Sequence, residues 1–247
     1  MKLIAWEKLP VEMQTEEVRK YYDILKKKKF GLFLKRVFDI VVSFLMLLIL
    51  LPVFLILAIA IKVDSPGPVF YRQLRVTQYG KKFRIFKFRT MVQNADQIGA
   101  GVTVKGDSRI TKVGSFIRKT RLDEICQLID VLRGTMTFVG TRPESVKYVE
   151  SYTSEMWATL LLPAGVTSDA SIYYKSEAEL LERAEDADKV YVEQILPAKM
   201  YYNLKSIEKF SFWGDIGIMF KTVFAVLGKE YKGDYQPKEN IGQKEEL

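Results

Sequence analysis

The hydrophobic positions of this chain concentrate in one long run near its beginning. The segment from Ile40 to Ile61, IVVSFLMLLILLPVFLILAIAI, contains 22 residues without a charge. That length is sufficient for a helix that spans a bilayer. Pro52 lies near its middle, where a proline removes a backbone hydrogen bond and bends a helix. The pattern therefore predicts a membrane helix over residues 35–63 with a break at Pro52.

Basic residues flank this run on both sides. Those before it are Arg19, Lys20, Lys26, Lys27, Lys28, Lys29, Lys35 and Arg36, and those after it are Lys62, Arg72, Arg75, Lys81, Lys82, Arg84, Lys87 and Arg89. Because cytoplasmic flanks carry the excess of Lys and Arg, this balance favours a re-entrant helix that leaves the membrane by the face it entered. Each half is then roughly 15–18 Å long, about one leaflet deep. A spanning helix is the alternative, with Lys35 and Lys62 on opposite sides.

Weaker periodicities predict further helices. Residues 12–30 indicate an amphipathic helix with a basic end, whose apolar side carries Val18, Tyr21, Tyr22 and Leu25. We interpret it as a helix lying on anionic lipid, the alternative being a solvated surface helix. Residues 207–228 mix Phe and Trp with apolar residues at helical spacing, which suits a core helix and an interfacial helix equally.

Two β-rich runs between Val69 and Met91 surround the turn residues QYGKK and predict a hairpin. The expected fold is α+β and mainly helical, with a re-entrant membrane helix, interfacial amphipathic helices and this small β-hairpin. The predicted organisation is an amphipathic, basic N-terminal extension (1–34), the membrane helix (35–63), a cytoplasmic catalytic domain at the membrane interface (64–230) and a polar, disordered C-terminal tail (231–247). The N-terminus lacks the features of a secretory signal.

Charge and composition narrow the chemistry. A net charge of +8 suggests an anionic partner, such as nucleic acid, an anionic membrane or a phosphorylated substrate. The single cysteine, Cys126, excludes an intrachain disulfide, and the absence of histidine excludes every mechanism that depends on an imidazole. Catalysis must then use carboxylates, Lys, Arg, Tyr, Ser or Thr.

Asp123 and Glu124 stand side by side in a basic segment, RKTRLDEICQLIDVLRGTMTFVGTRPE. Neighbours on a helix point about 100° apart, so the pair is poorly placed to flank one glycosidic bond. The two carboxylates can instead divide their work, one attacking phosphorus while the other holds Mg²⁺. Cations for a phosphate are available nearby: Arg118, Lys119, Arg121, Arg133 and Arg142. The alternative is a solvated face on which Asp123 and Glu124 pair loosely with Arg118 and Arg121.

Five blocks in order resemble the bacterial sugar transferases, the monotopic polyprenyl-phosphate phosphoglycosyl transferases. They are the membrane run after KRVFDI, then SPGPVFYRQLRV, GKKFRIFKFRTM, GDSRITKVGSFIRKTRLDE and QLIDVLRGTMTFVGTRPE, within residues 34–144. The resemblance implies transfer of a phosphosugar from a UDP-sugar to a polyprenyl phosphate, usually undecaprenyl phosphate, with release of UMP. It also implies Mg²⁺ as cofactor and a membrane helix that re-enters at a proline.

By the same resemblance, Asp123 matches the nucleophile of a covalent phosphosugar intermediate, and Glu124 matches the magnesium ligand. Lys87, Arg118 and Arg142 match basic positions that bind phosphate and nucleotide. The chain departs from the family pattern at Leu51 (usually Ser), Cys126 (commonly Pro) and Thr141 (Pro in the family motif). Its sequence after Pro163 also differs, which leaves the transferred sugar open.

The expected protein is thus an enzyme of the bacterial inner membrane that starts glycan assembly, with its catalytic domain on the cytoplasmic face. Expected partners are the UDP-sugar, the polyprenyl phosphate, membrane lipids and downstream glycan-assembly enzymes, and no nucleic acid. A catalytically inactive membrane scaffold of the same fold is the first alternative. A basic nucleic-acid-binding protein is the second, but it leaves the uncharged run without a purpose.

Overall fold

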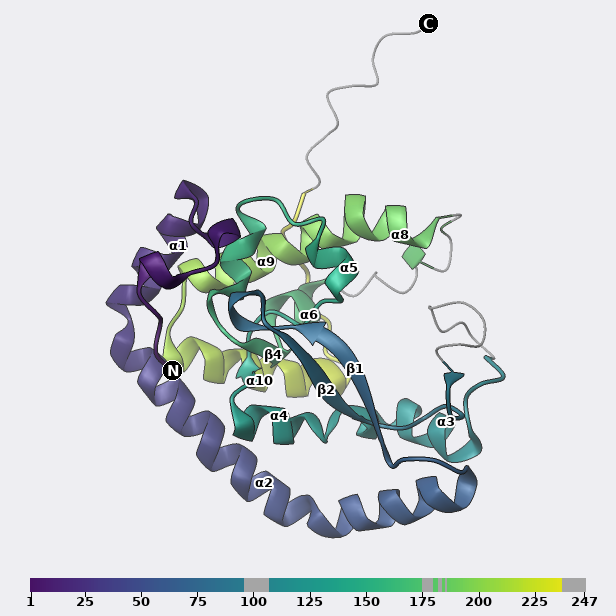
Figure 1. The fold of residues 1–247 in the computed structure, drawn as a ribbon. Helices are drawn as coiled ribbons and strands as arrows, with labels where there is room; N and C mark the ends of the chain where they lie inside the picture. Colours follow the sequence, from purple (N-terminus) through teal and green to yellow (C-terminus); the bar gives the residue numbers. More distant parts are fainter. Residues whose placement is uncertain (96–106, 175–179, 182–183, 185, 237–247) are drawn as a thin grey trace, which may run out of the picture.

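The computed structural model describes residues 1–95, 107–174, 180–181, 184 and 186–236. Helices dominate these residues, and two small two-stranded sheets accompany them (Figure 1). The elements are α1 (Glu16–Lys27), α2 (Lys29–Asp64), β1 (Phe70–Val76), β2 (Lys82–Phe88), α3 (Lys112–Lys119), α4 (Gln127–Arg133), β3 (Met136–Val139), α5 (Val146–Val149), β4 (Ala164–Thr167), α6 (Asp169–Tyr173), α8 (Ala187–Val190), α9 (Leu196–Glu208) and α10 (Phe212–Val226). The predicted mainly helical character is confirmed.

Helix α2 is long and curves along one edge of the molecule (Figure 1). It continues through Pro52, so the predicted break in the helix at this residue is absent. Among the described residues it alone is long and apolar enough to cross a membrane, with a mean hydropathy of 3.2 over its most apolar window. Three polar side chains of this helix, Lys35, Asp39 and Ser43, are buried against the protein. Many of its apolar side chains, such as Ile49, are exposed, although Leu32, Leu57 and Ile61 are buried. An apolar face of this extent suits a lipid environment.

The predicted N-terminal helix is present as α1, and the Thr15 side chain caps its first turn. The interpretation of its apolar face as a lipid-binding surface is wrong. The side chains of that face, Val18, Tyr21, Tyr22 and Leu25, are at most 4% exposed and pack on protein, in a cluster that includes Leu161 and Ile207. The predicted amphipathic helix is confirmed, but protein rather than lipid covers its apolar side.

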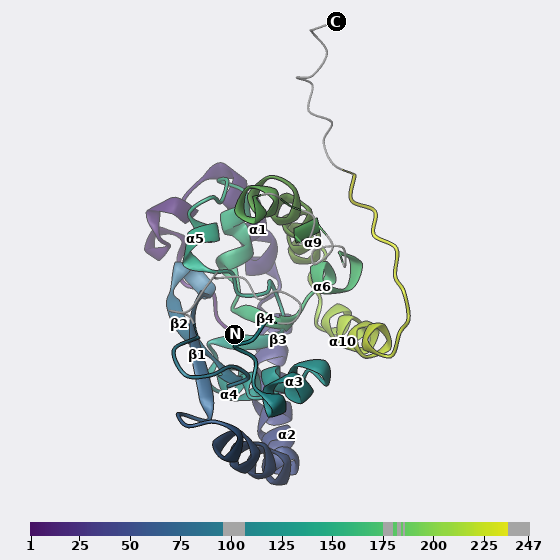
Figure 2. The same cartoon turned by 90° about the vertical axis from the view of Figure 1, so that its right-hand side faces the viewer.

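The predicted hairpin is present, since β1 and β2 pair antiparallel from Phe70 opposite Phe88 to Val76 opposite Lys82. A second pair, β3 with β4, is parallel and was not predicted. All four β3 residues are buried, and Figure 2 shows this pair between the hairpin and α10. Gly140 and Gly165 allow the two backbone segments to approach closely, because a Cβ on Gly165 would lie 2.2 Å from the backbone of Gly140.

The last helix combines both roles that its sequence suited. One side of α10 packs inward, where Asp215 and Ile218 are buried and Phe212 lies edge-on to Phe38 of α2. The other side leaves Trp213 and Phe220 77% and 63% exposed. This helix is therefore a core helix on one face and an apolar surface on the other.

The predicted polar tail begins as an ordered segment. Residues 231–236 contain no helix or strand, but the Tyr235 backbone N–H donates to the Tyr202 hydroxyl at 2.9 Å, and the Tyr231 ring contacts Tyr173. This part of the tail packs against α6 and α9 instead of extending freely into solvent. The remainder of the predicted tail, residues 237–247, lies outside the described residues.

Candidate active site

The paired carboxylates lie on a short 3₁₀ turn, Leu122–Glu124, between α3 and α4. Arg121 adopts the left-handed conformation at φ 55° just before the turn, which separates the two helices. The carboxylate-bearing turn thus joins the two helices α3 and α4. Beneath the turn, the fully buried Cys126 thiol contacts the Asp123 carbonyl oxygen at 3.4 Å.

Glu124 is held between two cations from distant parts of the chain. Its Oε1 atom accepts from Lys87 Nζ of β2 at 3.2 Å and from Arg142 Nη2, in the loop after β3, at 2.5 Å. Burial alone would disfavour the charged carboxylate, but the charges and hydrogen bonds of Arg142 and Lys87 prevail. They lower the pKa of Glu124 to about 2. Glu124 is therefore ionised throughout the neutral pH range.

Asp123 behaves in the opposite way. Burial and the adjacent negative charge of Glu124 raise the pKa of the Asp123 carboxyl, while Lys87 and Arg118 moderate the rise. Two neighbouring carboxylates are thus driven apart in pKa by their surroundings, as expected where they have different chemical tasks. The more basic of the two, Asp123, suits a nucleophile, and Glu124, which is ionised at neutral pH, suits a ligand for a cation.

Arg118 is placed by a contact that the sequence did not reveal. Its Nε atom donates to the buried Thr90 hydroxyl at 2.8 Å, which joins α3 to the end of β2. Gly114 makes this approach possible, because a Cβ there would lie 2.0 Å from the Thr90 carbonyl oxygen. The guanidinium is thereby fixed near enough to Asp123 to influence its pKa.

The structure therefore brings Lys87, Glu124 and Arg142 into direct contact and places Arg118 and Asp123 beside them. Pro52 lies within α2 and is not one of the residues in contact with Glu124. Of the three departures from the family pattern, Cys126 fills space under the turn. Leu51 lies exposed on α2, and the Thr141 carbonyl oxygen accepts from the Gly165 backbone N–H at 2.8 Å.

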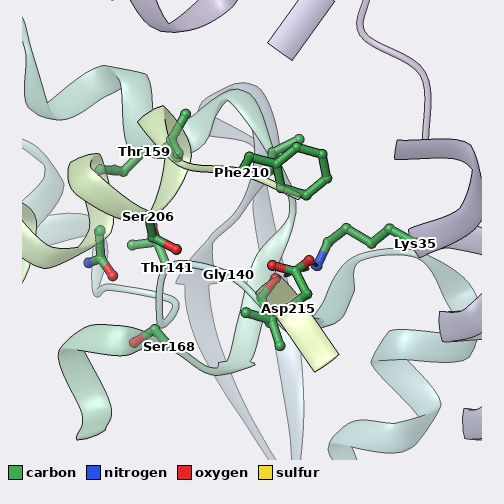
Figure 3. Close-up of a pocket in the computed structure, with 12 residues that line it drawn as sticks. Lys35, Gly140, Thr141, Thr159, Ser168, Ser206, Phe210 and Asp215 are labelled. Atoms are coloured by element: carbon green, nitrogen blue, oxygen red, sulfur yellow. Dashed lines mark hydrogen bonds and ion pairs between the residues drawn. The ribbon is translucent and has the colours of Figure 1, made fainter. Parts of the chain in front are cut away.

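A buried ion pair next to the site was also missed by the sequence analysis. Lys35 of α2 donates to Asp215 of α10 at 2.5 Å and to the Val139 carbonyl oxygen at 2.7 Å. Figure 3 shows Lys35 reaching Asp215 beside Gly140, at the start of the loop that carries Arg142. The spacing of Lys35 and Asp39 in KRVFDI, one helical turn apart at the head of the apolar run, was the available signal.

The cavity in Figure 3 is lined in part by Gly140 and Thr141 of this loop and has a volume of about 30 Å³. It has room for a water molecule or two and is too small for a nucleotide. Its lining includes the side chains of Thr141, Ser168 and Asn203. The carboxylate turn does not line it.

Mg²⁺ fits the carboxylate pair only in the company of other ligands. No group of three or more Cys, Asp and Glu side chains is arranged to hold a metal among the residues that the structure describes. Mg²⁺ commonly takes one or two protein carboxylates and completes its coordination with water and substrate phosphates. The ionised oxygen donor Glu124, beside Asp123, matches that requirement.

The combination of paired carboxylates with converging Lys and Arg side chains is suited to phosphate chemistry. A family model for the bacterial sugar transferases matches residues 30–229 of the chain. The chain therefore belongs to the bacterial sugar transferase family.

Curated relatives agree with this assignment. The chain is 36% identical over 199 residues to a UDP-N-acetylgalactosamine-undecaprenyl-phosphate N-acetylgalactosaminephosphotransferase of Aeromonas hydrophila, covering 79% of this chain and 44% of that protein. It is 39% identical over 196 residues to a UDP-glucose:undecaprenyl-phosphate glucose-1-phosphate transferase of Escherichia coli, covering 77% of this chain and 39% of that protein. The chain thus spans about two-fifths of the length of these relatives.

Proposed function

We propose that this protein transfers a phosphosugar from a UDP-sugar to a polyprenyl phosphate, typically undecaprenyl phosphate, and releases UMP. The observation that carries the proposal is the position of Glu124 between Lys87 and Arg142, with Asp123 adjacent. This cluster offers a nucleophile and a metal ligand on one turn, with cations for phosphate that reach it from other parts of the chain. The names of the relatives support the same donor and acceptor classes.

The proposed reaction has two steps. In the first, an Asp123 carboxylate oxygen attacks the β-phosphorus of the UDP-sugar, and the bond from that phosphorus to the bridging oxygen breaks, so that UMP leaves with the electron pair. In the second, a phosphate oxygen of the polyprenyl phosphate attacks the phosphorus of the aspartyl-phosphosugar, and the Asp123 carboxylate is regenerated. Each step develops negative charge on phosphate oxygens, which Lys87, Arg118 and Arg142 are placed to stabilise.

Glu124 is proposed to hold Mg²⁺ together with the donor's phosphates. Bound there, the ion would neutralise phosphate charge. Because the pKa of Glu124 is about 2, the carboxylate is available to a cation without first losing a proton. Lys87 and Arg142, which contact Glu124 in this structure, can then turn to the substrate phosphates.

The proposed setting is the cytoplasmic face of the bacterial inner membrane. Both flanks of α2 are basic, so the helix is proposed to enter the membrane and leave it by the same face, through its curvature and without a break at Pro52. The exposed apolar face of α10, with Trp213 and Phe220, would lie at the same surface. Association with downstream glycan-assembly enzymes stays a prediction.

The function is tested by UMP release from the detergent-purified protein with undecaprenyl phosphate, Mg²⁺ and a panel of UDP-sugars. Release with one donor, absent in Asp123→Asn, is the expected result. Release that persists in Asp123→Asn would refute the covalent role. If the folded protein shows no release with any donor, the inactive-scaffold alternative gains support.

The path of α2 is tested separately by labelling single cysteines from either side of sealed vesicles. Phe30→Cys and Val63→Cys are suitable because both positions are well exposed at the two ends of the helix. The native Cys126 is fully buried and gives a low background. Labelling of both positions from the same side is expected, whereas labelling from opposite sides would show a spanning helix.

A further inference from the structure

A buried polar cluster lies directly behind the loop that carries Arg142. Glu144 Oε2 accepts a hydrogen bond from the Tyr191 hydroxyl at 2.7 Å, and Glu144 Oε1 pairs with Lys199 Nζ at 2.9 Å. Lys199 Nζ also donates to the Tyr191 hydroxyl at 2.8 Å, which closes a triangle of three side chains. The three residues are between 5% and 7% exposed.

Stability alone does not explain such a cluster. Desolvation of two buried charges offsets most of their attraction, and well-packed apolar residues are often as stable. A buried polar network does, however, specify one geometry, because each partner must be in place to satisfy the others. The Tyr148 ring stacks on the Tyr191 ring with centroids 4.0 Å apart, which further restricts the orientation of the Tyr191 side chain. The cluster is thus better suited to fixing a position than to adding stability.

The position that it fixes is that of the loop from Gly140 to Glu144. The backbone of this loop is tied at both ends, where Gly165 N–H donates to the Thr141 carbonyl at 2.8 Å and Val76 N–H donates to the Glu144 carbonyl at 3.0 Å. Pro143 restricts the backbone between Arg142 and Glu144. The Glu144 side chain anchors the inner side of the loop while Arg142 extends from it to Glu124.

We infer that Glu144, held by Tyr191 and Lys199, is a positioning residue that aims Arg142 at Glu124 and at the phosphates of the donor. The inference rests on the proposed function for its substrate and deepens it. Tyr191 begins a π-helical turn, Tyr191–Ile195, which places its hydroxyl in the cluster. Such turns are frequent at functional sites.

The test compares Glu144→Gln and Tyr191→Phe in the native protein and in an Arg142→Lys background, with UMP release measured over a range of UDP-sugar concentrations. Each single change is expected to lower kcat/KM on the order of 10-fold to 100-fold, the size typical of a misplaced catalytic group. In the Arg142→Lys background the further loss is expected to be less than about 3-fold, because residues that act through one another are not additive. Tyr191→Phe removes only one hydroxyl, so it still tests the inference if Glu144→Gln does not fold.

Glu155→Gln is the matched control. Glu155 also accepts a hydrogen bond from a tyrosine hydroxyl, that of Tyr21 at 2.7 Å, but it lies outside the cluster. It should leave kcat/KM unchanged. An equal loss from Glu144→Gln with and without native Arg142, or unchanged kinetics in folded Glu144→Gln, would overturn the inference while leaving the proposed function intact.

A structure of Glu144→Gln provides a readout that needs no activity. The separation of Arg142 Nη2 from Glu124 Oε1, 2.5 Å in the native protein, should increase beyond ion-pair distance. An unchanged contact would overturn the inference. Absence of UMP release from the native protein would instead count against the proposed function, and the structural comparison would still decide the role of Glu144.

Discussion

The ion pair between Lys35 and Asp215 permits a prediction whose size follows from burial. The two side chains are 4% and 12% exposed, with 2.5 Å between Lys35 Nζ and Asp215 Oδ2. Lys35→Met removes the cation while keeping the length of the side chain. It leaves a buried carboxylate without its partner and the Val139 carbonyl without the donor at 2.7 Å. The predicted outcome is a large loss of stability, since an uncompensated charge in the interior is costly.

Breaking a buried pair from one side costs about 3–5 kcal/mol. For a chain of this length, each kcal/mol lowers the midpoint of thermal unfolding by about 2–4 °C, so a drop of about 6–20 °C is expected. The loss of stability in Lys35→Met should depend on pH. Burial raises the pKa of Asp215, and Lys35 opposes that rise. Without Lys35, the pKa of Asp215 should therefore be higher still. Protonation relieves the buried charge, and the loss should therefore shrink as the pH falls and grow as it rises through the raised pKa.

The assay is the intrinsic fluorescence of the three tryptophans during heating of detergent-purified protein at one fixed scan rate, between pH 5 and pH 8. The double variant Lys35→Met with Asp215→Leu should recover most of the midpoint, because both charges are gone. Lys20→Met, which removes the surface partner of Glu208, is the matched control and should not move the midpoint. A drop of less than about 2 °C, or a loss independent of pH, would refute the reasoning.

Three further predictions concern the site. Glu124→Gln should lower the rate of UMP release by on the order of 100-fold and remove its response to added Mg²⁺; an unaltered Mg²⁺ titration would contradict the ligand role. The rate should fall with decreasing pH as Asp123 is protonated, and the acid limb of the pH–rate profile should move to higher pH in Arg118→Met, because Arg118 helps to lower the pKa of Asp123; a limb that stays in place would contradict this electrostatic assignment. Gly165→Ala should impair UMP release and lower the unfolding midpoint, because its Cβ would meet the Gly140 backbone at 2.2 Å; native kinetics would show that the loop accommodates the methyl group.

Local patterns were sufficient for the elements that depend on nearby residues. An uncharged run of 22 residues can satisfy its backbone as a helix whatever surrounds it, and α2 covers it. The alternation around QYGKK similarly led to the β1–β2 hairpin, because a short turn brings adjacent strands together. The carboxylate pair and its candidate cations were also visible as residue types in order along the chain.

The sequence by itself therefore determined the membrane-type helix, the hairpin and the identity of the charged groups available for phosphate chemistry. Only the tertiary structure decided that protein covers the apolar face of α1, since amphipathicity specifies an apolar face without specifying what covers it. It also decided that Lys87 and Arg142 converge on Glu124 from positions 37 and 18 residues away, and that Glu144 anchors the loop from behind. These contacts depend on how distant segments of the backbone pack together. The periodicity of residues along one segment carries no information about that packing.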